Sequence, residues 1–171
     1  MNRSVAWVVL LLGLFGAAQA LAGAGYLTIK ATKKTADTRE GGNVTMGKNI
    51  QLEERDVYYE LDIRSMAATP QELRVDWVVL VKTIKGRLRT ADRGEETITL
   101  KTGETKTLET SLITLREEAG PKGNGFKGKI EGVGVRVTDA EGAVVGELYE
   151  PATSRKNLED AFAGEIKRRK D

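Results

Sequence analysis

The sequence is organised around one apolar stretch, LRVDWVVLV at residues 73–81. Every second residue in it is large and apolar, and an extended backbone places all of these side chains on one face. They are Leu73, Val75, Trp77, Val79 and Val81. The opposite face is polar at its ends, with Arg74 and Lys82, and apolar in the middle. This pattern predicts a central strand with one face buried in a core and the other partly covered by a neighbouring element.

The composition excludes several classes of function. The 171 residues include no cysteine and no histidine, so the chain is neither a disulfide scaffold nor a thiol enzyme, and it lacks the commonest general base and transition-metal ligand. Its 27 basic and 25 acidic residues give a net charge of +2. This balance predicts no nucleic-acid partner, because such proteins are usually strongly basic or carry a basic stripe.

Residues 1–20 predict a secretory signal peptide. Arg3 precedes an apolar run over residues 5–18, and Ala18-Gln19-Ala20 fits the small-x-small rule for cleavage after Ala20, with a second candidate site after Ala24. An uncleaved membrane anchor is the alternative, because residues 5–24 are just long enough to span a bilayer. We favour cleavage, and the absence of cysteine from an exported chain indicates a bacterial periplasmic or extracellular location.

Alternating apolar residues predict about seven strands in the rest of the chain. Their ranges are 26–33, 50–66, 73–81, 95–101, 105–115, 129–139 and 143–149. The strands at 50–66 and 73–81 are expected to form an antiparallel hairpin, with residues 133–137 facing them from the other sheet. The apolar positions of 105–115 change parity, which predicts a bulge near Ser111.

The segments between these strands predict turns and loops. Gly103 and Gly142 are placed for tight hairpin turns at 102–104 and 139–142. Polar, glycine-rich or charged composition predicts connections at 34–47, 87–94 and 116–128.

Strands at this spacing, separated by glycine and proline, predict an all-β antiparallel sandwich. Trp77 in the third strand, the Asp139–Gly142 hairpin and the segment GVGVRVTD at 132–139 resemble the immunoglobulin-like sandwiches of uncharacterised exported bacterial proteins. The resemblance implies an immunoglobulin-like fold and brings no functional residues with it. We expect a signal peptide at 1–20, a β-sandwich domain at 21–150, and a C-terminal helix and basic tail at 151–171.

The motifs that suggest catalysis or cofactor binding all lack their required context. Gly123, Gly125 and Gly128 match a dinucleotide-binding string but precede a strand instead of a helix, so we interpret them as a loop. The acidic residues at 53–56 and 117–118 lack the spacing of a calcium loop and indicate a solvated strand edge. No serine-nucleophile motif is present. We predict no catalytic, cofactor or metal site, and no enzyme.

Two groups of residues are candidates for partner binding. A helix is predicted from Arg155 to Lys170 with Ser154 as its N-cap, and it carries an apolar stripe. We favour docking of this stripe onto the open end or edge of the sandwich, with a partner helix or an anionic surface as alternatives. The second group is an arginine cluster that could contact polyanionic glycans but more often marks a solvated loop. The six candidates are Leu158, Phe162 and Ile166 in the stripe, and Arg87, Arg89 and Arg93 in the cluster.

The predicted function is an exported, non-catalytic binding or structural module whose partner is an envelope protein or a glycan. A carbohydrate-binding or carbohydrate-acting accessory protein is the first alternative, with Tyr58, Tyr59 or Trp77 as sugar platforms. An assembly component anchored by an uncleaved leader is the second. Burial of Trp77 discriminates against the sugar-platform hypothesis, because a platform must expose its ring.

Overall fold

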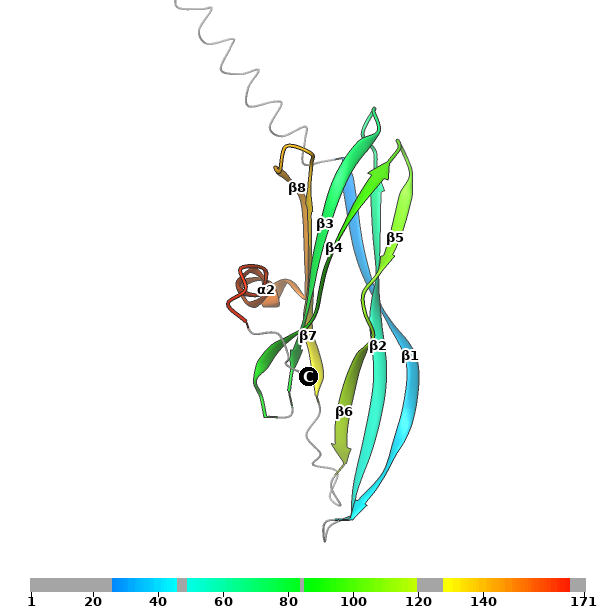
Figure 1. Ribbon diagram of the computed structural model, residues 1–171, viewed down its shortest axis with the longest axis vertical. Coiled ribbons are helices and arrows are strands. Elements are labelled where there is room, and N and C mark those ends of the chain that lie inside the picture. Colours follow the sequence, from blue (N-terminus) through cyan, green and yellow to red (C-terminus); the bar gives the residue numbers. More distant parts are fainter. Residues whose placement is uncertain (1–25, 46–48, 84, 120–127, 167–171) are drawn as a thin grey trace, which may run out of the picture.

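The computed structural model describes residues 26–45, 49–83, 85–119 and 128–166, which form two antiparallel sheets packed face to face (Figure 1). In the first sheet, β2 (Asn49–Ser65) pairs on one side with β1 (Leu27–Thr45) and on the other with β5 (Thr105–Glu109) and β6 (Ile113–Ala119). The second sheet has the order β4 (Leu88–Leu100), β3 (Gln71–Lys82), β7 (Lys129–Thr138), β8 (Val144–Glu150). The predicted all-β antiparallel sandwich is confirmed.

Strand β3 is central, as its sequence predicts. It is hydrogen-bonded to β4 on one side and to β7 on the other. Leu73, Val75, Trp77 and Val79 are buried in the core between the sheets. Val78 and Leu80 are buried on the opposite face in a second, smaller apolar cluster. Both faces of this strand are therefore covered.

The expected hairpin of β2 with β3 is wrong. The two strands belong to opposite sheets, and residues 66–70 pass from one sheet to the other. Residues 133–137, expected in the facing sheet, lie in β7 beside β3. Periodicity shows that one face of each strand is buried. The same alternation is expected for a strand next to β3 in its own sheet and for a strand in the facing sheet, so it cannot distinguish the two. The Gly103 turn likewise has the positive φ predicted, 76°, but joins β4 to β5 in the other sheet instead of closing a hairpin.

Two segments predicted as connections are strands. Residues 34–45 continue β1, which pairs with β2 as far as Asn49, so this hairpin extends past the end of the second sheet in Figure 1. Residues 88–94 form the first half of β4. Backbone pairing with a long partner strand outweighs the weak β-propensity of these sequences. The third predicted connection, 116–128, begins as β6, and its residues 120–127 lie outside the described residues.

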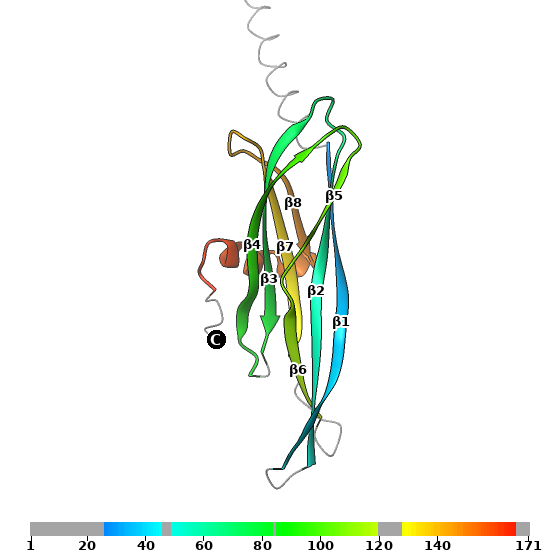
Figure 2. The same ribbon diagram turned by 45° about the vertical axis from the view of Figure 1, so that its right-hand side comes forward.

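The parity change predicted near Ser111 is confirmed, although the strand is interrupted there instead of bulged. Strands β5 and β6 follow one another along β2 with residues 110–112 between them (Figure 2). Leu108 and Ile113 are buried on either side of this break, whereas Leu112 is 62% exposed. The Asp139–Gly142 turn closes the β7–β8 hairpin as predicted, with Gly142 at a φ of 83°.

The C-terminal helix docks on its own domain, but on the outer face of the second sheet and not at an open end or edge (Figure 1). A short 3-10 turn, η1 (Ala152–Ser154), leads into α2 (Arg155–Phe162), which is shorter than the helix predicted. Ser154 is not a side-chain cap; its hydroxyl donates to the carbonyl of Glu131 at 2.8 Å. Among the described residues, no helix is long and apolar enough to cross a membrane.

Close packing of α2 depends on glycine in β7. Gly134 lies under the helix, where a Cβ would stand 2.9 Å from Cε2 of Phe162. Leu158 and Ala161 are buried against Val78 and Leu80, and Phe162 and Ile166 pack at the margin of this cluster. The predicted apolar stripe is therefore used for contacts within the chain.

Candidate functional site

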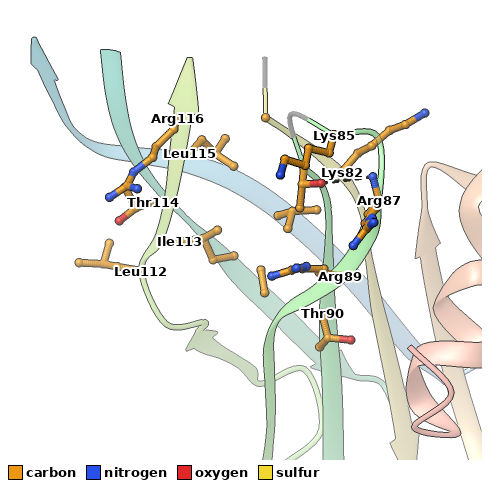
Figure 3. Close-up of a pocket in the computed structure, with 14 residues that line it drawn as sticks. Lys82, Lys85, Arg87, Arg89, Thr90, Leu112, Ile113, Thr114, Leu115 and Arg116 are labelled. Carbon is orange, nitrogen blue, oxygen red and sulfur yellow. Dashed lines mark hydrogen bonds between the residues drawn. The ribbon is translucent and has the colours of Figure 1, made fainter. Parts of the chain in front are cut away.

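The structure separates the three arginines of the predicted cluster. Arg93 is directed to the helix, where its guanidinium donates to the carbonyl of Phe162 at 3.1 Å. Arg87 and Arg89 instead line a pocket at the end of the sandwich, where the β3–β4 connection faces β6 (Figure 3). The six predicted site residues thus lie in two places. Arg93 and the three stripe residues lie at the docked helix, and Arg87 and Arg89 lie at the pocket.

The pocket has a volume of about 750 Å³, within the range of ordinary small-molecule sites. Its lining comes from the ends of β3, β4 and β6 and from the segment before β7. Basic side chains are contributed by Lys82, Lys85, Arg87, Arg89 and Arg116. The remaining lining residues are Val81, Thr83, Thr90, Ala91, Leu112, Ile113, Thr114, Leu115 and Gly128.

Irregularities in three strands coincide at this end of the sandwich. On one side of β3, the register with β4 skips Ala91 between Val79 and Leu80. On the other side, the register with β7 skips Glu131 between Leu80 and Val81. Because a bulge bends its strand and increases its twist, two bulges at the same level turn the end of the second sheet. The first sheet is interrupted nearby, before Ile113, and we attribute the pocket to these combined departures from regular pairing.

Arg89 is positioned on the inner face of the second sheet. It is the cross-strand partner of Val81, whose side chain packs against the main core, and cross-strand partners share a face. In Figure 3 the Arg89 side chain extends across the pocket toward Ile113 of β6. The Arg89 guanidinium therefore lies at the open end of the inner face, where this side chain remains exposed.

The β3–β4 connection that carries the other cations is closed by its own hydrogen bonds. The amide of Thr83 donates to the carbonyl of Arg87 at 2.8 Å, and the amide of Arg87 donates to the Thr83 hydroxyl at 3.2 Å. Gly86 takes the positive φ of 75° that this tight connection needs, and its amide donates to the carbonyl of Thr83 at 2.8 Å. These bonds fix the backbone that carries Lys85 and Arg87, whose side chains are exposed.

Positive charge at the pocket is not neutralised by the described residues. No aspartate or glutamate is among the described residues that line it, and within the described ranges Lys82, Lys85, Arg87 and Arg89 form no ion pair. Arg116 is the exception, because its Nε lies 2.8 Å from a carboxylate oxygen of Glu54. Uncompensated cations around a concave site raise the local concentration of anions.

The described lining of the pocket provides groups suited to binding an anion. Its described lining offers guanidinium, ammonium and hydroxyl donors beside aliphatic walls, and no carboxylate stands beside the threonines to activate a nucleophile. The described residues also hold no group of three or more aspartate and glutamate side chains placed for a metal ion. Arginine and lysine suit carboxylate, sulfate or phosphate, with arginine able to bind in bidentate fashion.

The aromatic residues considered as sugar platforms are mostly inside the protein. Trp77 is 8% exposed and Tyr59 is 7% exposed, and both belong to the main core. Tyr58 alone is half-buried. The carbohydrate hypothesis therefore retains only one of its three proposed platforms.

Sequence reasoning missed Lys82, Lys85 and Arg116 as members of the site. A signal for the first two was present, because the segment KTIKGRLRTA at 82–91 has four cations and no acidic residue. Grouping Arg87 and Arg89 with Arg93 and Asp92 concealed this segment.

Comparisons with known proteins do not assign the chain to a family. No family model and no curated protein matches its sequence. A target of the Northeast Structural Genomics Consortium, solved by X-ray, matches with a TM-score of 0.40 and 8% identity over 74% of this chain and 86% of its own. A β-glucuronidase from Bacteroides uniformis matches with a TM-score of 0.39 and 12% identity over 74% of this chain and 13% of its own. The likeness is limited to coarse β-sandwich architecture, and this chain spans about an eighth of the glucuronidase's length.

Proposed function

We propose that this chain is an exported, non-catalytic binding module that takes an anionic ligand in the pocket between its sheets. The observation that carries the proposal is the group of four cations, Lys82, Lys85, Arg87 and Arg89, around a cavity of about 750 Å³ without an ion partner among the described residues. Cations gathered around one cavity repel one another, and a bound anion offsets that repulsion.

The arrangement of these cations supports a binding site more strongly than the same charges scattered over the surface would. The rim residues stand on a connection closed by internal hydrogen bonds, and Arg89 projects from a paired strand. The backbone beneath the cations is therefore already ordered, so binding a ligand costs only the ordering of their side chains.

The apolar stripe of α2 does not support partner binding in this state, because its residues pack on the second sheet. Among carbohydrates, acidic glycans fit this proposal, because they carry the anionic groups that the pocket requires. An anchored assembly component depends on residues 1–20, which lie outside the described residues. Intact-mass measurement of the exported protein tests the export proposal: we expect loss of residues 1–20, and a mass that includes them would contradict cleavage.

Anion binding is tested by titrating the mature, isotope-labelled protein with pyrophosphate and with a heparin-derived hexasaccharide while amide shifts are recorded. We expect shifts concentrated at residues 81–91 and 113–116, with affinity falling as salt is added. The double variant Lys85→Gln/Arg89→Gln should weaken binding at least tenfold. Arg64→Gln removes an exposed arginine outside the pocket and should leave binding unchanged. Failure of both anions to shift these residues would overturn the proposal.

A further inference from the structure

We infer that the ligand of this pocket is an anionic amphiphile, a single aliphatic chain with an acidic head group, bound as a monomer with its head at Arg89 and its chain between the sheets. The inference rests on the proposed function and specifies its ligand. It follows from the aliphatic walls of the pocket, which binding of an anion alone does not explain.

The inner walls are aliphatic and continuous with the core. Val81, Ala91 and Leu115 are partly buried residues that pack against the main core, and Ile113 is a buried member of it. Each of the three partly buried residues keeps apolar surface that the described residues leave uncovered. Covering such surface with hydrocarbon is favourable in proportion to the area removed from water.

At the rim of the pocket, cationic and apolar side chains also lie together. Leu112, 62% exposed, is one of the few large apolar side chains that the described residues leave in solvent, and it lines the same pocket as Arg89. A ligand that is anionic at one end and aliphatic along its length satisfies both kinds of surface. A small inorganic anion satisfies only the cations.

A sugar fits these walls less well. The described lining residues include no aromatic ring on which a pyranose could stack and no carboxylate or amide side chain to accept hydrogen bonds from its hydroxyls. Saturated hydrocarbon needs neither. The lining therefore favours the amphiphile over the acidic glycan, although both carry the charge that the rim requires.

The test is a calorimetric titration of the mature protein with octanoate, decanoate and laurate below their micelle concentrations, with decanol and decyltrimethylammonium as neutral and cationic matches. We expect affinity to rise on the order of tenfold for each two methylenes, and the carboxylate to bind at least tenfold more tightly than either match. Arg89→Gln should reduce laurate affinity about tenfold, whereas Arg64→Gln should not change it. Ala91→Phe should remove most of the dependence on chain length by filling the cavity, and thermal melting checks that each variant is folded.

The outcomes separate this inference from the proposed function. If pyrophosphate and alkyl carboxylates bind equally and chain length has no effect, the amphiphile inference is wrong and anion binding stands. If chain length matters but decanol binds as tightly as decanoate and Arg89→Gln has no effect, the anionic head group is wrong and the inference fails; anion binding is then decided by the pyrophosphate and hexasaccharide titrations alone. Co-sedimentation with phosphatidylglycerol vesicles, against phosphatidylcholine controls, distinguishes a bilayer lipid from a free one. Binding to vesicles without binding to laurate would overturn the monomeric ligand.

Discussion

Trp77 donates a buried hydrogen bond from its indole nitrogen to Oδ2 of Asp92, with the two atoms 2.9 Å apart. The same oxygen accepts the backbone amide of Ser111 at 3.2 Å. Trp77 lies on β3, Asp92 on β4 and Ser111 in the break between β5 and β6, so one carboxylate connects the two sheets. Gly94, the cross-strand partner of Trp77, leaves the ring the space that any Cβ would occupy.

Replacing Asp92 with alanine should lower the free energy of unfolding by about 2–4 kcal/mol, because a buried indole N–H and a partly buried amide lose their acceptor. Asp92→Asn retains an acceptor oxygen and should cost less. Urea denaturation followed by fluorescence provides the measurement, with Glu96→Ala, an exposed acid on the same strand, as control. A loss below about 1 kcal/mol for Asp92→Ala would contradict the role given to this carboxylate.

Trp77→Ala should cost on the order of 3–5 kcal/mol, since a large buried ring is removed from the main core. This is a substantial part of the stability of a domain of this size. The sequence has two tryptophans, Trp7 and Trp77, so in a chain cleaved after Ala20 all tryptophan fluorescence comes from Trp77. Circular dichroism must therefore follow unfolding of this variant. A cost under about 1 kcal/mol would place the ring in solvent.

Two leucines give a matched test of helix docking. Leu158 is fully buried on the side of α2 that faces the sheet, and Leu158→Ala should lower the free energy of unfolding by about 2–5 kcal/mol. Leu112 is 62% exposed, and Leu112→Ala should change it by less than about 0.5 kcal/mol. Urea denaturation compares the two variants, and limited proteolysis should cut the C-terminal segment faster in the first. Equal, small effects would show that α2 does not dock stably.

Tyr59 should weaken the protein at high pH. Burial, with a smaller contribution from the charge of Glu150, raises the pKa of Tyr59 to about 12 from 10.0. Between these values the unfolded chain has lost the phenolic proton and the native protein retains it, so the free energy of unfolding falls as pH rises. The loss attributable to Tyr59 should be about 1–2 kcal/mol.

The measurement is urea denaturation at pH 9, 11 and 12 for the unmodified protein, Tyr59→Phe and Tyr58→Phe. The Tyr59 variant should lose less stability than the unmodified protein over this interval. The Tyr58 variant, which alters a half-buried neighbour, should follow the unmodified protein. Parallel curves for the unmodified protein and Tyr59→Phe would count against the raised pKa.

The sequence predicts elements whose pattern is local. Residues 73–81 identify β3 because alternate apolar side chains follow from strand geometry, and Gly103 and Gly142 identify turns because they supply a positive φ. The first half of β4 is not visible in this way. Its inner positions hold Asp92, which accepts from Trp77, and Gly94, which leaves space for the Trp77 ring. Neither residue is apolar, so the alternation that predicts a strand is missing.

Which strands meet, and which cations meet, depends on contacts between distant residues. Arg116 reaches the pocket because β6 pairs with β2, and no spacing in the sequence records this. In a regular strand Arg89 and Arg93 would share a face. The bulge at Ala91 shifts the alternation by one residue, so Arg93 lies on the opposite face and reaches the end of α2. The stripe of Leu158, Phe162 and Ile166 predicts an apolar contact correctly but does not identify the surface that receives it.

The double covering of β3 has a consequence for the dynamics of the domain. Its backbone is paired on both edges, the main core covers one face, and the helix cluster covers the other at Val78 and Leu80. Solvent therefore has no local route to these amides, and their hydrogens should exchange with deuterium only through global unfolding. Exchange at Val78 to Leu80 thus measures the stability of the whole domain, whereas exchange within α2 measures the free energy of releasing the helix alone.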